Sequence, residues 1–395
     1  MTFYNMKQCI YIITEAFFNE RDKERYGVNF FLAKGHRVVV IDATNYFYKT
    51  LTVTYENYKA DNDLVVHTCN SYKSIKAVMP KGGSGIAFLF IGSDYKSIRI
   101  RKLCHINKIR FGVVEAGFVP DTLHMNTPKR NIVKKFYLGL KKYGIFRTMV
   151  IVLEHICANI SHDVEGDFLF TTDKDKSLSR IGLALPNSIN IINSRDYDVY
   201  LDVKKMPRLK PDKYIVFIDQ NMLNCKDFLR MGINFGLDSS TYFDELNGYF
   251  NYVEHEHNCK VVIAAHPKSD VNVVRGEYSG REVFINETAL LIRDCEFVIN
   301  YYSTAISFAV LDRKPIFFIT LNDFKNTIVE DFTEGLSKSL GNSTLNISND
   351  DIKHDLIINY DRYSDYEVKY IKSIDTELRT MDLIYTKLSR LGFLN

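Results

Sequence analysis

Short apolar runs rich in β-branched residues alternate with helix-like segments along the chain, and this alternation constrains the fold most strongly. In the first part of the sequence the runs lie at residues 9–14, 37–41, 63–68, 86–91, 109–114, 168–172 and 189–193. Continuous apolar strands separated by helices are typical of a parallel sheet that is covered on both faces. We therefore expect an α/β protein with doubly wound sheets.

The same alternation restarts later in the chain, which predicts a second domain. Apolar runs recur at residues 214–218, 260–265, 282–285, 297–300 and 315–319. A length of 395 residues exceeds what one core usually accommodates. Two prolines among charged residues at 204–212 are typical of a linker. We predict Rossmann-like domains at 1–205 and 206–395 that face a cleft.

The end of the sequence carries a helical pattern. Apolar residues recur from Val368 to Leu388 at intervals of three and four, which predicts one amphipathic helix over residues 366–391. Packing of this C-terminal helix back on the first domain is one arrangement that we expect.

Charge and cysteine usage exclude several classes of protein. The chain has 51 basic and 48 acidic residues, a net charge of +3, so a global nucleic-acid footprint is absent. Its seven cysteines are scattered and form no CxxC pair, which argues against a disulfide framework or structural zinc. We expect a cytoplasmic protein. The basic stretch between Lys129 and Arg147 has two interpretations, a solvated helix face or peripheral contact with an anionic membrane or glycan.

Ligands of doubly wound sheets bind beyond the carboxyl ends of the strands, so chemistry is sought there. The apolar run at 260–265 leads directly into His266, Pro267 and Lys268. Proline ends the strand and fixes the backbone that presents the histidine. An imidazole that donates a proton beside a lysine charge suits a phosphate group.

A second strand end carries hydroxyl groups. The run at 297–300 ends in Asn300, and Ser303 and Thr304 follow at the predicted start of a helix. Free backbone N–H groups and hydroxyls at such a start favour an anion. The sequence therefore predicts that the His266 and Ser303 segments bind the same phosphate from two sides. The alternatives are a buried histidine at a turn for His266 and an ordinary helix N-cap without a ligand for Ser303.

Carboxylates form the third group of strand-end residues. Asp219 follows the run at 214–218, Glu115 follows the run at 109–114, and Glu15 follows the first run. Paired carboxylates suit transfer of a sugar, one as base or acid and the other as nucleophile or ion-pair partner. A carboxylate that only caps the following turn is the alternative for each of them.

These motifs resemble those of the bacterial sialyltransferase-like GT-B glycosyltransferases, which include polysialyltransferases and the Kdo transferases of surface polysaccharide synthesis. His266-Pro267 and Ser303-Thr304 match the two motifs that hold the CMP part of the donor in that group. The segment Arg21-Asp22-Lys23-Glu24-Arg25-Tyr26-Gly27 also looks like an Arg-Asp-x-x-Arg-Phe-Gly segment found in proteins of such clusters.

The resemblance implies a metal-independent transferase that needs no cofactor. It would move a 2-keto sugar acid, Kdo or a sialic-type relative, from a CMP donor to an O-antigen or capsule glycan. His266, Pro267, Lys268, Gln220, Asn300, Ser303 and Thr304 would bind the donor. Glu115 would be the base. The corresponding motif of that group usually has two acidic residues before a glycine, and this chain departs from it. Asp219 would be the nucleophile of a retaining reaction, His266 would assist departure of CMP, and Lys268 or Arg275 would hold the sugar carboxylate.

Two other functions fit the same motifs. Polyol-phosphate transferases of teichoic acid synthesis also combine a His-Pro with a serine pair and use CDP-glycerol or CDP-ribitol. A non-catalytic GT-B subunit that binds a nucleotide without turnover is the third possibility.

Overall fold

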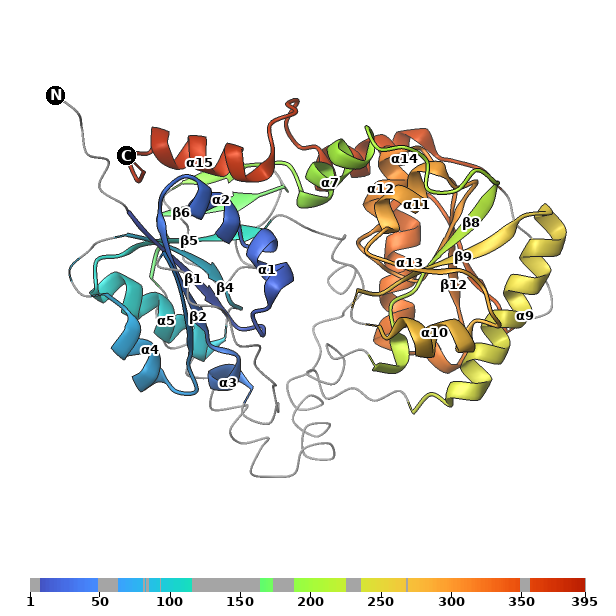
Figure 1. Cartoon of the computed structure of the whole chain (residues 1–395), viewed down its shortest axis with the longest axis horizontal. Helices are drawn as coiled ribbons and strands as arrows, with labels where there is room; N and C mark the ends of the chain where they lie inside the picture. Colours follow the sequence, from blue (N-terminus) through green and yellow to red (C-terminus); the bar gives the residue numbers. More distant parts are fainter. Residues whose placement is uncertain are drawn as a thin grey trace. The chain divides into compact units, whose positions relative to one another are not determined.

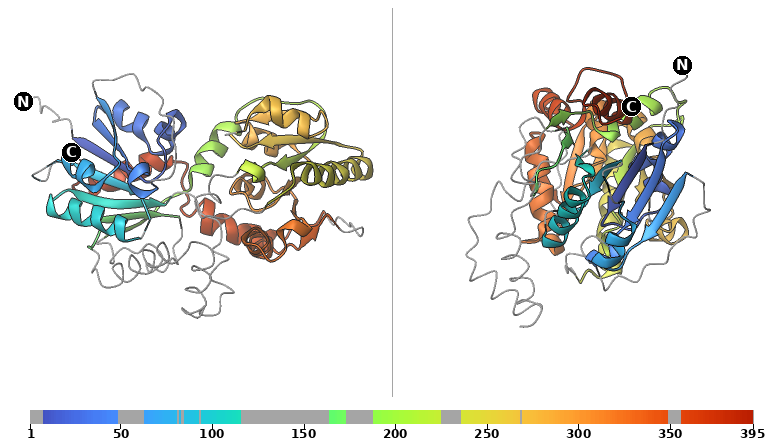
Figure 2. Two further views of the ribbon diagram at one scale, coloured as in Figure 1. Left: turned by 90° about the horizontal axis from the view of Figure 1, so that it is seen from below. Right: turned by 90° about the vertical axis from the view of Figure 1, so that its left-hand side faces the viewer.

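The computed structural model describes residues 8–48, 63–80, 82, 85–92, 94–115, 164–172, 188–224, 236–267, 269–348 and 356–394. The chain divides into two compact α/β units, which Figure 1 and Figure 2 draw with colours that follow the sequence. Among the described residues, unit 1 holds those up to Ile192 together with 380–394, and unit 2 holds 193–379. No helix in these described ranges has the length and apolarity that crossing a bilayer requires.

Unit 1 is built on a parallel sheet of seven strands in the order β3-β2-β1-β4-β5-β6-β7. The strands are β1 (Cys9–Thr14), β2 (Arg37–Asp42), β3 (Leu64–Thr68), β4 (Ile86–Phe90), β5 (Arg110–Glu115), β6 (Phe168–Thr171) and β7 (Ile189–Ile191). The helices are α1 (Glu20–Arg25), α2 (Val28–Ala33), α3 (Thr44–Phe47), α4 (Tyr72–Val78), α5 (Tyr95–Ile106) and α15 (Thr380–Arg390).

The two faces of this sheet are covered by different helices. Alternate residues of the central strands, such as Ile13 and Leu89, pack with Ile75 of α4 and Leu103 of α5. The other face is covered by α2 and by the C-terminal end of the chain, where the ring of Phe393 lies 6.2 Å from that of Phe168. A sheet buried on both sides needs apolar residues at successive positions, which explains the continuous runs in the sequence.

Unit 2 repeats the architecture with six parallel strands in the order β10-β9-β8-β11-β12-β13. The strands are β8 (Tyr214–Ile218), β9 (Lys260–Ala265), β10 (Val283–Ile285), β11 (Val298–Asn300), β12 (Ile316–Thr320) and β13 (Thr344–Asn346). The helical segments are α7 (Arg195–Val203), η2 (Met222–Asn224), α9 (Ser239–His257), α10 (Val271–Glu277), α11 (Thr288–Asp294), α12 (Ile306–Leu311), η3 (Asn322–Phe324), α13 (Ile328–Ser339), α14 (Tyr360–Tyr366) and the π-helix η4 (Glu367–Ile371).

Strand β8 lies in the interior of unit 2, and all five of its residues are buried. Tyr214, Val216 and Ile218 pack with α7, α11 and α12 on one face. Ile215 and Phe217 pack with α9 on the other. The strand therefore contributes to both cores and holds the centre of the sheet.

The predicted linker is part of unit 2. Arg293 of α11 donates hydrogen bonds to the carbonyl oxygens of Met206 and Pro207 at 2.7 and 3.2 Å, and Lys210 forms an ion pair with Glu282. These contacts fix residues 204–212 on the body of unit 2. The structure accordingly divides the chain between Ile192 and Asn193, before α7, and not at the predicted 205/206.

The continuous C-terminal helix predicted over residues 366–391 is wrong. The helix formed by α14 and η4 ends at Ile371, and α15 begins at Thr380. Between them, the backbone N–H of Ile374 donates to Oδ1 of Asn193, whose side chain donates to the carbonyl of Thr376. These tertiary hydrogen bonds replace the helical ones, and the chain passes from unit 2 back to unit 1 between Arg379 and Thr380.

Strands β5 and β6 approach closely at Gly112, which predicts a test of the sheet. A Cβ there would lie 2.1 Å from the carbonyl oxygen of Phe168, its pairing partner. We expect Gly112→Ala to lower the free energy of unfolding by about 1–3 kcal/mol, because the strands must separate. Gly248→Ala is the control, since a Cβ added there on α9 would have nothing within 4 Å. This variant should gain up to about 1 kcal/mol of stability. Equal denaturation midpoints for both variants would contradict the packing described.

Candidate functional site

The carboxyl edge of the unit 2 sheet collects the residues that the sequence singled out. Asp219 follows β8, His266 follows β9, and Ser303 follows β11. These three strands are neighbours in the order β9-β8-β11, and their pairing is parallel, so their carboxyl ends lie at one edge. The chain continues from β8 to β9 on one side of β8 and later returns to β11 on its other side. The boundary between β8 and β11 is therefore the topological switch point, where such sheets bind ligands.

Asp219 is a buried hub of hydrogen bonds at this edge. Its side chain is only 6% exposed, and its Oδ1 accepts the backbone N–H of Asn221 at 2.8 Å. The hydroxyl of Tyr278 and the backbone N–H of His266 also donate to the carboxylate. Burial raises the pKa of Asp219, and these donors oppose that rise. The carboxylate thus ties the end of β8 to the turn that carries His266.

Buried tyrosines surround this carboxylate. Tyr278 follows α10, Tyr301 follows β11, and Tyr242 lies on α9, and all three are at most 2% exposed. Burial first, and then the Asp219 charge, raises the pKa of Tyr278 well above its ordinary value. The hydroxyl of Tyr278 is therefore held as a neutral donor to Asp219.

A second side chain bridges the switch point. Oε1 of Gln220, beyond β8, accepts the backbone N–H of Tyr302, beyond β11, at 3.3 Å. The Tyr302 hydroxyl donates to Sδ of Met222 at 3.7 Å, and its ring stacks on that of Phe332 at 5.6 Å. Gln220 thus holds the two loops together where they leave the sheet.

The turn after β11 is closed by its own side chains. Oδ1 of Asn300 accepts the backbone N–H of Ser303 at 3.1 Å, and Oγ of Ser303 accepts that of Ala305 at 3.2 Å. The backbone N–H of Thr304 donates no hydrogen bond within the described part of the chain, and Thr304 is exposed. The turn therefore offers one backbone donor and two hydroxyl-bearing residues to a ligand. Helix α12 has only six residues, so its dipole adds little to the predicted anion site.

His266 and Pro267 are both half-buried at the rim of the sheet. The carbonyl of His266 accepts the backbone N–H of Ser269 at 2.8 Å, which closes the turn before α10. Lys268 lies outside the described residues, and Arg275 is exposed on α10. The imidazole is thus presented by a backbone held at both its N–H and its carbonyl.

Unit 1 has a switch point of its own, between β1 and β4. Glu15 follows β1, and its Oε2 accepts the backbone N–H of Gly92, beyond β4, at 2.9 Å. Its Oε1 accepts the hydroxyl of Tyr48 at 3.5 Å. Glu115 ends β5, one strand further from this boundary, and is half-buried. The sequence prediction weighed both carboxylates, and within unit 1 Glu15 is the one at the switch point.

Sequence reasoning missed two residues of the unit 2 edge, Tyr278 and Tyr302. Tyr278 lies beyond α10 in the sequence and reaches Asp219 only through the packing of α10 on the sheet. Tyr302 directly precedes Ser303, so its place beside the predicted turn was the available signal. In the described ranges, no group of three or more His, Cys, Asp or Glu side chains is arranged to hold a metal ion.

The raised pKa of Asp219 predicts a pH effect on stability. The folded chain binds this proton more tightly than the unfolded chain, so the contribution of Asp219 to the free energy of unfolding should fall as pH rises above the ordinary pKa of 3.8. Asp219→Asn should remove this contribution from the pH slope. Asp238→Asn is the control, because Thr241 lowers the pKa of Asp238 and the slope change should have the opposite sign. Denaturant titrations between pH 3.5 and about pH 7 measure the slopes, and an unchanged slope in Asp219→Asn would contradict the assignment.

Comparisons with known proteins support the architecture. No protein-family model matches the sequence, and no curated protein is significantly similar to it. The solved structures that it resembles include the calicheamicin glycosyltransferase CalG4, with 9% identity, 98% of this chain and 100% of that chain covered, and a TM-score of 0.53. A variant of the wall teichoic acid polymerase TagF has 10% identity, coverage of 98% and 90%, and a TM-score of 0.50.

A UDP-GlcNAc 2-epimerase from Methanocaldococcus jannaschii is also similar, with 13% identity, coverage of 98% and 100%, and a TM-score of 0.48. At these identities the likeness shows the fold alone. The predicted fold class is confirmed: two doubly wound, Rossmann-like α/β domains of the GT-B type.

Proposed function

We propose that this protein is a glycosyltransferase that moves a 2-keto sugar acid from a CMP donor to a surface glycan of the O-antigen or capsule type. Kdo is the first choice of sugar and a sialic-type nonulosonate the second. The donor binds at the carboxyl edge of unit 2, and no metal takes part. The proposed location is the cytoplasm.

The observation that carries this proposal is the convergence of three sequence motifs on one edge. Asp219, His266 and Ser303 follow the adjacent strands β8, β9 and β11, and Gln220 bridges the switch point between them. The order of the six strands is that of dinucleotide-binding sheets, in which phosphate groups lie at this boundary. The GT-B fold adds support, because it is shared with a glycosyltransferase of known structure.

The phosphate of the donor lies against the turn after β11 in this proposal. The backbone N–H of the exposed Thr304 and the hydroxyls of Ser303 and Thr304 donate to its oxygens from one side, and the imidazole of His266 from the other. An acceptor hydroxyl attacks the anomeric carbon, the bond from that carbon to the phosphate oxygen breaks, and CMP leaves. Donors that are fixed before the reaction stabilise the negative charge that develops on the phosphate.

Asp219 acts as a positioning residue in this reaction. Its carboxylate is buried, and backbone N–H groups and the Tyr278 hydroxyl occupy it. A nucleophile must reach the anomeric carbon, whereas this geometry fixes the turn that carries His266. We therefore favour positioning over the covalent adduct that the resemblance implied, and a direct displacement over retention through Asp219.

The base that deprotonates the acceptor is proposed to be a carboxylate of unit 1. Glu115 is the residue that the resemblance implies, and Glu15 is the alternative that its place at the β1/β4 boundary favours. Contact of the stretch between Lys129 and Arg147 with an anionic membrane remains a proposal of the sequence, because that stretch lies outside the described residues.

A second candidate is a CDP-polyol phosphotransferase of the teichoic acid type. The likeness to the wall teichoic acid polymerase favours it, and the same turn and imidazole suit its donor. The two reactions differ in their products. A CMP-sugar donor gives CMP and a new glycosidic bond, whereas CDP-glycerol gives CMP and a phosphodiester. Incubation with each donor and analysis of the extended acceptor by mass spectrometry separates them.

His266→Ala is expected to lower the turnover of a CMP-sugar donor by at least about a hundredfold, because a proton donor to the leaving phosphate is lost. The fold should persist, because the contact with Asp219 uses the backbone N–H of residue 266. His255→Ala is the matched control, an exposed histidine at the C-terminal end of α9. Wild-type turnover in His266→Ala would count decisively against the proposed site.

The carboxylate of unit 1 is identified by two parallel substitutions. If Glu115 is the base, Glu115→Gln should lower kcat by about a hundredfold while donor affinity stays unchanged, and Glu15→Gln should do the same if Glu15 is the base. Calorimetric titration with CMP and steady-state rates measure the two quantities. Wild-type kcat in both variants would show that neither carboxylate is the base.

A further inference from the structure

The segment at residues 21–27, singled out in the sequence, is only partly explained by the fold. Asp22 accepts the backbone N–H of Asn19 at 3.1 Å and closes the start of α1. The hydroxyl of Tyr26 lies 3.2 Å from Oγ1 of Thr14. Gly27 has a φ of 73°, and a Cβ there would lie 2.3 Å from Cε of Met381. Aspartate, tyrosine and glycine are therefore structural residues.

The two arginines of the segment have no such role. Arg21 and Arg25 are both exposed and lie four residues apart, so they share one face of α1. Within the described part of the chain neither forms an ion pair, although Arg25 lies 5.8 Å from the ring centroid of Tyr26. The acidic residues of the helix contact other groups.

The carboxylates of α1 contact groups other than the two arginines. Lys23 pairs with Glu20 at 2.8 Å, Glu24 accepts a hydrogen bond from Asn29, and Asp22 accepts one from Asn19. Within the described part of the chain, the guanidinium groups of Arg21 and Arg25 are therefore outside the ion pairs of the helix. Two such guanidinium groups one turn apart match a carboxylate or phosphate, which arginine binds through parallel hydrogen bonds.

The backbone that presents these arginines is held rigidly. The N–H of Phe18 donates to Oδ2 of Asp42 at 3.0 Å, and that of Ala16 to Oγ1 of Thr14 at 3.1 Å. The corner between β1 and α1 is thus fixed by residues of β1 and β2. Such a supported corner keeps α1 in one place and lowers the entropy cost of binding a ligand.

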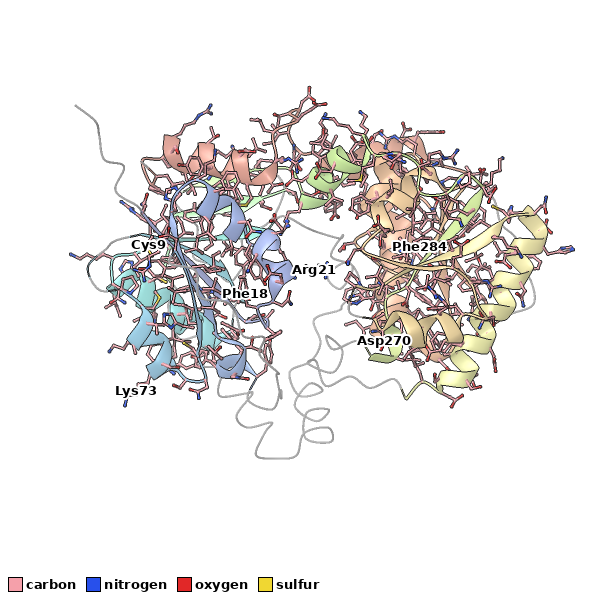
Figure 3. The ribbon with its side chains drawn as sticks, in the orientation of Figure 1. Cys9, Phe18, Arg21, Lys73, Asp270 and Phe284 are labelled. Carbon is pink, nitrogen blue, oxygen red and sulfur yellow. The ribbon has the colours of Figure 1, made fainter. Side chains whose placement is uncertain are left out.

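The location also favours a ligand. Helix α1 follows β1 at the carboxyl edge of the unit 1 sheet, next to the β1/β4 boundary where Glu15 contacts Gly92. Figure 3 shows Arg21 on the side of α1 that faces away from the sheet, with Phe18 on the inner side. The guanidinium is therefore open to a molecule that approaches this edge.

We propose that Arg21 and Arg25 form an anion-binding site for the acceptor, and that they bind a carboxylate or phosphate group of an acidic glycan. The inference deepens the proposed function, because it specifies an acidic acceptor for the same enzyme. Binding of this acceptor to unit 1 requires no donor, so it is measured separately.

Three oligomers of similar length serve as probes of the full-length protein: a sialic acid tetramer, a glycerol phosphate tetramer and neutral maltotetraose. The test variant is Arg21→Gln with Arg25→Gln. Lys23→Gln removes a positive charge from the same helix that Glu20 already compensates. Arg37→Gln removes an exposed arginine at the amino end of β2, at the opposite edge of the sheet. Arg21→Lys with Arg25→Lys retains the positive charges but not the bidentate geometry of arginine.

Calorimetric titrations should show that the wild type binds one acidic probe and not maltotetraose. Arg21→Gln with Arg25→Gln should lose about tenfold in affinity for that probe, and Arg21→Lys with Arg25→Lys should recover only part of this affinity. Both control variants should bind like the wild type. Which acidic probe binds identifies the group, carboxylate or phosphate. Unchanged affinity in the double glutamine variant, equal losses in the controls, or no binding of either acidic probe would overturn the inference.

The same variants keep this inference separate from the proposed donor chemistry. CMP affinity should be unchanged in Arg21→Gln with Arg25→Gln, because that ligand binds to unit 2. If the wild type binds acidic probes through these arginines but fails to bind CMP, the acceptor site stands and the proposed donor falls. If CMP binds and the acidic probes do not, the reverse holds.

Discussion

Parallel pairing of β8 with both β9 and β11 is the constraint on which the candidate site at the carboxyl edge of the unit 2 sheet depends. Parallel strands direct all their carboxyl ends to one edge, so residues distant in sequence meet there without any further device. The loops beyond β8 and β11 diverge, and the space between them is bridged by Gln220 and Tyr302. In unit 1 the side chain of Glu15 makes the equivalent bridge to the backbone of Gly92.

The Asp219 carboxylate shows how a strand end is converted into a fixed site. Burying a carboxylate is costly, and its raised pKa records that cost. Hydrogen bonds from Tyr278 and from backbone N–H groups offset it and join β8, β9 and the end of α10. A carboxylate after an apolar strand is equally compatible with chemistry and with this kind of cross-linking. Exposure to the ligand distinguishes the two roles, and exposure is not encoded in the local sequence.

The interior strands were predictable because burial on both faces demands unbroken apolar runs. Strands β1, β8 and β9 begin and end at the residues predicted. The edge strand β13 escaped prediction, because it is short, its residues are only half-buried, and Leu345 stands between the polar Thr344 and Asn346. The break after η4 escaped it as well, since the apolar spacing continues across residues 372–379 while Asn193 takes the backbone hydrogen bonds. The local sequence pattern indicates which residues are buried. It does not indicate which distant side chain forms hydrogen bonds with the backbone.

The placement of the candidate residues was predictable to the same extent. The meeting of His266, Ser303 and Asp219 at one edge follows because strand ends are recognisable in sequence and parallel sheets bring them together. Tyr278 was not found, because its contact with Asp219 depends on how α10 packs. The same limit applied to residues 204–212, which have the composition of a linker but are anchored by Arg293 and by the ion pair of Lys210 with Glu282.

The return of the chain to unit 1 has a consequence for biosynthesis. Helix α15 supplies Tyr385, whose hydroxyl lies 3.3 Å from Nε2 of His36, and Met381, which packs on Gly27. The strands of unit 1 leave the ribosome first, yet the part of one sheet face that α15 covers stays exposed until α15 has been synthesised. Unit 2 is complete by then. The earlier half of the nascent chain therefore matures last, and its apolar face is the surface that a chaperone would meet.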